Sequence, residues 1–284
     1  MPSSESRTPA AFFAAVFVSL LVLPGSLAAL ELNGEAVQGG LMFGQAEPGS
    51  AVRLDGRDVM VSDTGRFVIG FGRDESGTRV LSVKEPGGVQ ETIELTVAAR
   101  DYRIERVDGL PPRTVTPDPE SLERIRRDAA LVRAARAMRD QRTDYAAGFA
   151  WPAQGRISGV YGSQRVLNGE PRRPHFGVDV AAPTGTPVLA PAPGVVTLAE
   201  PDLYYSGGTI VLDHGQGLSS SFLHLSALHV AVGDRVEAGE LIAAIGATGR
   251  ATGPHLDWRM NWLDRRVDPQ LLMDGEPPAL PAAE

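Results

Sequence analysis

Hydrophobic and polar positions alternate along residues 30 to about 100. Apolar side chains recur at every second position, as at Phe67, Ile69 and Phe71, and turn-forming pairs such as Asp55-Gly56 separate the runs. A period of two is typical of half-buried β-strands, and several short strands divided by such turns indicate a small antiparallel sandwich. We therefore predict a β-sandwich-like domain over residues 29–110. A spacer, a partner-binding module and a lid are all compatible with this pattern.

After a Pro-rich connector, the spacing of apolar residues changes to that of a helix. Asp118 suits the N-cap of a helix and Pro119 suits its first position. An apolar stripe with helical spacing follows, at Leu122, Ile125, Ala129 and Val132. We predict that the connector and helix occupy residues 111–148, where seven arginines fall between Arg124 and Arg142. A solvated helix face and a basic surface for an anionic polymer or acidic partner both fit this composition.

Short strands return from Phe149 onward, with Gly and Pro between them. The predicted strands include residues 194–199, 209–213, 218–225, 241–245 and 255–260. We assign residues 149–272 to a second β-rich domain and residues 273–284 to a disordered tail. The predicted fold class is all-β: a small N-terminal sandwich, a linking helix and a C-terminal antiparallel β domain.

The first residues have the pattern of an export signal. Arg7 precedes an apolar run of fourteen residues from Ala10 to Leu23, and Ser26 and Ala28 suit the −3 and −1 positions of a cleavage site. The run is shorter than the ~20 residues that span a bilayer comfortably. We therefore predict a signal peptide over residues 1–28. An uncleaved anchor is the alternative, and only then would the chain contact the membrane. Both interpretations place the rest outside the cytoplasm, in the periplasm or the extracellular space.

Composition narrows the chemistry. The chain has no cysteine, so a metal would be held by His, Asp or Glu. A net charge of −8 argues against a nucleic-acid partner.

All five histidines lie in the last domain. His175 and Asp179 are four residues apart, and His255 and Asp257 are two apart, so each pair shares a face of an extended chain. His224 lies on a third predicted strand. A zinc site with imidazole and carboxylate ligands needs such a set, together with an open position for water.

Several segments in order resemble the lysostaphin-type zinc metalloendopeptidase family. They cover about residues 151–270 and comprise YGSQR, HFGVD, AAPTGTPVLAPAPGVV, HGQGLSSSFLHLS and VGDRVEAGELIAAIGATGRATGPHL. The resemblance implies a compact antiparallel β-structure with zinc on the floor of a groove. It also implies hydrolysis of peptide cross-links in peptidoglycan, with peptide stems as the substrate.

Carried over residue by residue, the resemblance assigns His175 and Asp179 as zinc ligands and His224 and His255 as the catalytic pair. The family's third ligand is normally a histidine two residues after the position of His255, where this chain has Asp257. Two carboxylates cancel the +2 charge of zinc, so the site should acidify water less than a site with two histidines and one aspartate.

Three hypotheses are considered, and the departure at Asp257 favours the second. The first is an exported zinc metalloendopeptidase that holds zinc through residues 175, 179 and 257. The second is a non-catalytic groove that binds cell wall or activates a separate amidase. The third is that the sandwich or the arginine-rich helix covers the groove. The N-terminal domain is also a candidate contact for an envelope protein.

Overall fold

The computed structural model describes residues 30–107, 119–167 and 169–280. The predicted signal peptide over residues 1–28 and the Pro-rich part of the connector, residues 108–117, lie outside these ranges. In the described residues, no helix combines the length and apolar character needed to cross a bilayer.

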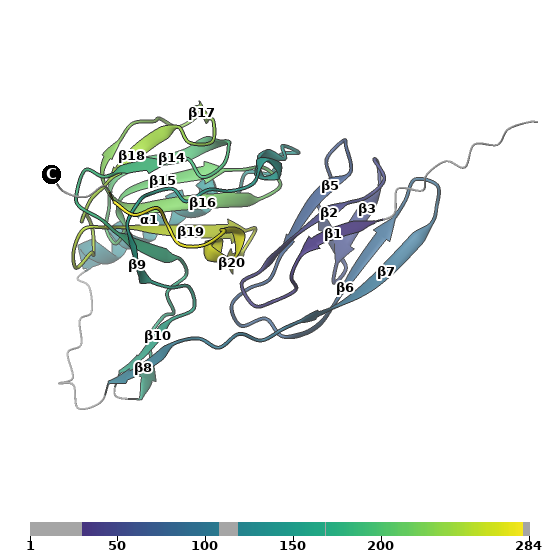
Figure 1. Ribbon diagram of the computed structural model, residues 1–284, viewed down its shortest axis with the longest axis horizontal. Helices are drawn as coiled ribbons and strands as arrows, with labels where there is room; N and C mark the ends of the chain where they lie inside the picture. Colours follow the sequence, from purple (N-terminus) through teal and green to yellow (C-terminus); the bar gives the residue numbers. More distant parts are fainter. Residues whose placement is uncertain (1–29, 108–118, 168, 281–284) are drawn as a thin grey trace, which may run out of the picture.

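Two sheets form the N-terminal domain, purple to blue in Figure 1. One has the strand order β1-β2-β5 and the other β4-β3-β6-β7. Their bounds are β1 (Glu31–Gly34), β2 (Leu41–Gln45), β3 (Ala51–Leu54), β4 (Arg57–Val59), β5 (Arg66–Gly70), β6 (Gly77–Lys84) and β7 (Gln90–Val97). Buried and exposed residues alternate along β3, as the sequence period predicts. A small β-sandwich is the result.

The linking region contains a strand and a helix. Strand β8 (Ile104–Val107) pairs with β10 (Gln164–Leu167), which also pairs with β11 (Glu170–Pro171). The β8–β10 pairing is parallel, whereas the sequence analysis expected antiparallel strands only. Helix α1 (Pro119–Ala135) begins at the predicted proline, whose fixed φ and missing N–H suit a first helical turn.

A ten-stranded sheet dominates the C-terminal domain, teal to yellow in Figure 1. Its main path is β17-β14-β15-β16-β19-β12-β9, with β18 joining β13 to β16 and β20 pairing with β19. The bounds are β9 (Arg156–Gly159), β12 (Val178–Ala181), β13 (Pro187–Leu189), β14 (Gly194–Leu203), β15 (Gly207–Asp213), β16 (Leu218–Leu228), β17 (Arg235–Val236), β18 (Leu241–Ile245), β19 (His255–Trp262) and β20 (Arg265–Val267). Two 3-10 turns add Asp144–Ala147 and Pro269–Leu272. The predicted all-β class is confirmed.

The two faces of this sheet follow from strand register. Residues directly opposite each other on paired strands share a face, so Val211, Ser221 and Arg259 lie together. We call this the front face; on β19 it carries His255, Asp257, Arg259 and Asn261. Helix α1 lies on the front face, because Ala135 and the partly buried Val132 pack in one cluster with Val211.

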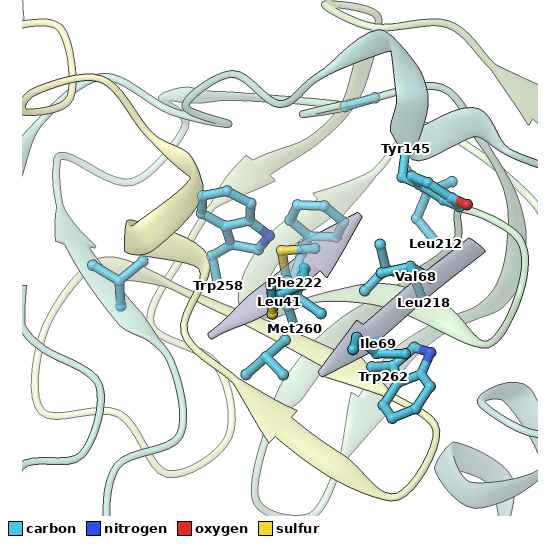
Figure 2. Packing of buried hydrophobic residues seen from close by; sticks show 14 of the residues in the cluster. Leu41, Val68, Ile69, Tyr145, Leu212, Leu218, Phe222, Trp258, Met260 and Trp262 are labelled. Atoms are coloured by element: carbon cyan, nitrogen blue, oxygen red, sulfur yellow. The ribbon is translucent and has the colours of Figure 1, made fainter. Parts of the chain in front are cut away.

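The back face holds the hydrophobic core; on β19 it consists of Leu256, Trp258, Met260 and Trp262. Figure 2 shows Leu41, Val68 and Ile69 of the N-terminal sheet among the back-face side chains of the C-terminal domain. A Cβ on Gly70 would come within 3.1 Å of the Cβ of Trp262, so the two domains approach very closely here. The N-terminal sandwich therefore packs behind the sheet, away from the front face, contrary to the hypothesis that it covers the groove.

The segment after residue 272 makes backbone contacts. The indole N–H of Trp151 donates to the carbonyl of Gly275 at 3.2 Å, and the N–H of Gly155 donates to the carbonyl of Pro278 at 2.9 Å. These contacts hold part of the segment that the sequence predicts to be a disordered tail. Residues 281–284 lie outside the described ranges.

Candidate metal centre

Two adjacent strands and the turn before one of them position the candidate ligands. Asp179 on β12 is directly opposite Asp257 on β19, so their side chains leave the same face. His175 precedes β12 and is linked to it through Gly177. A Cβ on Gly177 would meet the carbonyl oxygen of Trp258 at 2.5 Å, so glycine is needed for the chain to pass this close to β19.

The structure brings His175, Asp179 and Asp257 together. One ligand atom from each lies within 4.8 Å of the others. The Nε2 of His175 is 3.1 Å from the Oδ1 of Asp179, and both atoms are buried with no other polar partner. Buried polar atoms with so few partners are costly, and a cation between them would satisfy both.

The donor set fits a divalent metal. Zinc–nitrogen and zinc–oxygen bonds of about 2.0–2.2 Å place tetrahedral ligands about 3.4 Å apart. The ligand atoms lie within 4.8 Å of one another, so they would have to approach by at most about 1.4 Å to reach this spacing. Imidazole and carboxylate are both ordinary zinc ligands, so these residues could hold the ion.

Arg259 is a partner of Asp257 that the sequence analysis missed. Its Nε donates to Oδ1 at 2.9 Å and its Nη2 donates to Oδ2 at 2.5 Å. Burial by itself would raise the pKa of Asp257, but the guanidinium outweighs it and holds the pKa below the usual value. The signal was present in the sequence, because Arg259 follows Asp257 by two residues on one strand and must share its face.

The carboxylates also influence His175. Burial lowers the pKa of this imidazole, but the hydrogen-bonding influence of Asp179 and the charge of Asp257 outweigh burial and raise it. The negative charge that favours the protonated ring would also attract a metal cation.

His224 and His255 form a pair beside the candidate ligands. Their ring centroids are 4.8 Å apart. Each Nδ1 lies 2.8 Å from a backbone carbonyl, that of Thr248 for His224 and that of Gly253 for His255. A carbonyl only accepts, so each neutral ring carries its proton on Nδ1 and leaves the Nε2 lone pair free. Both rings thus have the tautomer that can take a proton at Nε2.

The backbone at His224 is unusual. Its φ of 65° lies in the left-handed region, which a histidine inside a strand rarely adopts. Such strain persists only where the surroundings enforce it, and it occurs preferentially at functional sites. Here the His224 N–H donates to the carbonyl of Ser206 at 2.8 Å, which fixes the turned backbone. Burial lowers the pKa of His224 and favours the neutral ring.

The two remaining histidines lie away from the site. His214 is fully buried, with its Nδ1 donating to the carbonyl of Pro193 at 2.7 Å. His229 directly follows β16 and is exposed. Neither belongs to the group of candidate metal ligands found among the described residues.

Part of this chain is similar to known peptidases. The model of peptidase family M23 matches residues 173–269. The DD-carboxypeptidase/endopeptidase Mpg of Neisseria meningitidis is 42% identical over 97 residues, covering 34% of this chain and 22% of that protein. The peptidoglycan DD-endopeptidase ShyA of Vibrio cholerae is 41% identical over 87 residues, covering 31% of this chain and 20% of that protein. The match thus spans about a fifth of these curated relatives.

A solved structure extends the similarity to most of the chain. A crystal structure from Pseudomonas aeruginosa, described as a peptidase M23, is 31% identical with a TM-score of 0.64. The match covers 84% of this chain and 95% of that one. Fold and site thus define a β-sheet metallopeptidase class. The chain belongs to peptidase family M23.

Proposed function

We propose that this chain is an exported zinc metalloendopeptidase that hydrolyses peptide cross-links of bacterial peptidoglycan. The observation that carries the proposal is the convergence of His175, Asp179 and Asp257 beside two histidines, with His175 Nε2 and Asp179 Oδ1 buried and in polar contact only with each other. Family membership supports the reaction class, and the names of the curated relatives support the substrate. The apolar run at residues 10–23 supports export.

Zinc would be held by His175, Asp179 and Asp257. When bound, it supplies Lewis-acid polarisation of a peptide carbonyl and lowers the pKa of water at the open position. The free Nε2 of one catalytic histidine takes the proton of the attacking water. The other histidine, once protonated at Nε2, donates to the oxyanion or to the leaving amine. Either His224 or His255 can fill either role.

Arg259 changes the charge balance at the site. Two carboxylates and a neutral imidazole cancel the charge of a zinc ion, which would weaken its acidifying effect. The guanidinium of Arg259 binds both oxygens of Asp257 and returns one positive charge. The Asp257–Arg259 pair therefore resembles a neutral ligand electrostatically, as a histidine at residue 257 would be. With this pair, an aspartate at residue 257 is compatible with the proposed zinc chemistry.

Metal analysis and two variants test the proposal. Purified full chain should contain one zinc per molecule and cleave isolated sacculi. His175→Ala should lose both zinc and cleavage, because it removes a ligand. His255→Ala should keep zinc and lose cleavage, because it removes only a proton acceptor. A protein without zinc whose two variants release peptides at the rate of the unmodified chain would falsify the proposal.

A second candidate is a non-catalytic groove that binds cell wall. The observation that favours it is the same ion pair, since Arg259 occupies lone pairs of Asp257 that a metal would need. Asp257→His alone is a poor test, because it leaves a buried guanidinium unpaired at a cost of about 3–5 kcal/mol. The double variant Asp257→His/Arg259→Gln avoids that cost. If neither it nor the unmodified chain cleaves sacculi, yet both bind them, the binding function is correct.

A further inference from the structure

A cavity of about 620 Å³ lies between helix α1 and the front face. Five of its lining residues are arginines: Arg133, Arg136, Arg139, Arg173 and Arg266. We call it the arginine pocket. They come from the helix and its C-terminal extension, the segment before His175 and strand β20, so the fold gathers them from three distant parts of the chain.

The arginine pocket adjoins the candidate metal centre. The Nη2 of Arg136 donates to the Oγ of Ser221 at 2.8 Å, and Ser221 is directly opposite Arg259, the partner of Asp257. Asn261, on the pocket floor, follows Asp257 by four residues on the same face of β19. At about 3.3 Å per residue this separation is about 13 Å, the length of four residues of extended peptide.

An aromatic ring ties two of the arginines to the metal ligands. The guanidinium carbons of Arg173 and Arg266 lie 5.6 and 6.0 Å from the ring centroid of Phe176. Phe176 directly follows His175 in the chain. These cation–π contacts hold both cations next to the ligand segment without neutralising them.

The arginines of the pocket are not neutralised by direct ion pairs. Among the described residues, the ion pairs near the pocket involve Arg57, Arg124 and Arg265, and none involves Arg136, Arg173 or Arg266. Two acids line the pocket, and each pairs with an arginine that does not. Asp128 lies 4.0 Å from Arg124 and accepts from the backbone N–H of Tyr204 at 2.8 Å, and Asp264 lies 3.9 Å from Arg57.

Burial and the unbalanced positive charge lower the pKa of Arg136 and of Arg266. Burial, and then the charges of neighbouring arginines, lower the pKa of Arg136 to about 9 and that of Arg266 to about 10. The Nε of Arg136 is buried and has no hydrogen-bond partner. An anion in the pocket would relieve the repulsion and accept that hydrogen bond.

We propose that the arginine pocket is a subsite that binds a carboxylate of the peptide substrate about four residues from the bond cleaved. This inference rests on the proposed function, which supplies the peptide. Arginine presents a planar fork of donors that matches a carboxylate. The apolar side chains of Val132 and Leu203 in the same wall suit the rest of a peptide better than a fully hydrated polyanion. The net charge of −8 also disfavours polyanions.

A pair of matched peptides tests the subsite. The probe is a synthetic stem tetrapeptide with free carboxylates, which has no cross-link to cleave, and its control is the same peptide with carboxamides. We expect the full-length chain to bind the acid form about tenfold more tightly than the amide form, which corresponds to about 1.4 kcal/mol, in isothermal titration calorimetry.

Variants locate the effect. Arg136→Gln and Arg173→Gln should each remove most of the preference and leave the affinity for the amide form unchanged. Arg127→Gln is the matched control, because Arg127 lies on the same helix, is exposed and does not line the pocket. Arg173 is exposed, so its variant should fold even if Arg136→Gln does not.

Three outcomes overturn the subsite: equal affinity for the two peptides, binding of neither, or a preference that survives both pocket variants. Sacculus cleavage is measured separately. Loss of the preference in both pocket variants of a chain that cleaves nothing supports the subsite and rejects the proposed peptidase. Cleavage by a chain that does not distinguish the peptides rejects only the subsite.

Discussion

The two faces of strand β19 differ in almost every physical property. Its front face carries His255, Asp257, Arg259 and Asn261, whereas its back face carries Leu256, Trp258, Met260 and Trp262. Most of these side chains are buried, so burial alone does not separate the faces. The difference lies in what each face contacts: charged and polar partners in front, and the hydrophobic core shared with the N-terminal domain behind.

The comparison shows how one strand serves two purposes. Because side chains alternate between the two faces of a strand, the residues of one face can form a functional site while those of the other face form the hydrophobic core. Substitutions on the back face should therefore reduce stability and spare the site, while substitutions in front should do the reverse. Each prediction below tests that separation.

The largest effect is expected behind the sheet, at Trp258. This side chain is fully buried and packs edge-on against Trp151 at 6.0 Å between ring centroids. Trp258→Ala should lower the free energy of unfolding by about 3–5 kcal/mol, since it removes a large apolar group and leaves a cavity. Urea denaturation measures the loss. Trp258→Phe should lose clearly less, and the folded fraction of either variant should keep the metal content of the unmodified chain.

The next effect is a pH dependence that originates at His214. Burial lowers the pKa of this imidazole to about 4, against about 6.5 in the unfolded chain. The folded state therefore binds fewer protons between these values, and stability from the neutral ring is complete above pH 6.5 and is lost as pH falls to 4. The loss is about 3 kcal/mol. Unfolding curves at a series of pH values should show it, and His214→Gln should flatten the profile over this window. An unchanged profile would contradict the assignment.

On the front face, Asp179→Asn should lower the metal affinity and leave the stability of the fold nearly unchanged. Asparagine keeps the shape but loses the negative charge, and the metal affinity should fall at least about a hundredfold, beyond the usual effect of removing a partner that only orients a ligand. Stability in the absence of metal should change little, because the substitution removes both the repulsion from Asp257 on the neighbouring strand and the attraction to His175. Competition with a chelator of known affinity measures the change. Asp58→Asn, at an exposed acid of the N-terminal domain, should leave the affinity unchanged.

Local patterns account for most of what the sequence could predict. The strand period located Leu241–Ile245 with correct bounds, and the start of α1 at Pro119 followed from turn and cap chemistry. The grouping of His175, Asp179 and Asp257 followed from spacing on strands and from family resemblance. These features depend on neighbours within a few residues, which is the range over which sequence patterns carry information.

The features that escaped prediction depend on long-range contacts. Nothing local to Gly70 indicates that it touches Trp262, nearly two hundred residues away in a different domain. The arginine pocket likewise joins Arg136, Arg173 and Arg266, which share no spacing. The helix pattern did suggest a basic face, but which of its arginines turn toward the sheet depends on how α1 packs.

Two adjacent serines provide the finest test of the two faces. Ser220 points backward, where its Oγ lies 2.9 Å from the Nε2 of His214 and 3.2 Å from the Nε1 of Trp258. The Nδ1 of His214 already donates to a carbonyl, so Nε2 must accept the hydroxyl proton while the indole N–H donates to the oxygen. Ser220→Ala leaves two buried groups unpaired and should cost about 2 kcal/mol of stability.

Ser221 points forward and accepts from Arg136 at 2.8 Å. Because Arg136 is only half-buried and water can replace the serine, Ser221→Ala should cost about 1 kcal/mol or less, yet weaken binding of the acid peptide about threefold. Chemical denaturation and peptide titration on the same two proteins measure both properties. If the two variants lose stability and peptide affinity in the same proportion, the faces of the sheet are not independent.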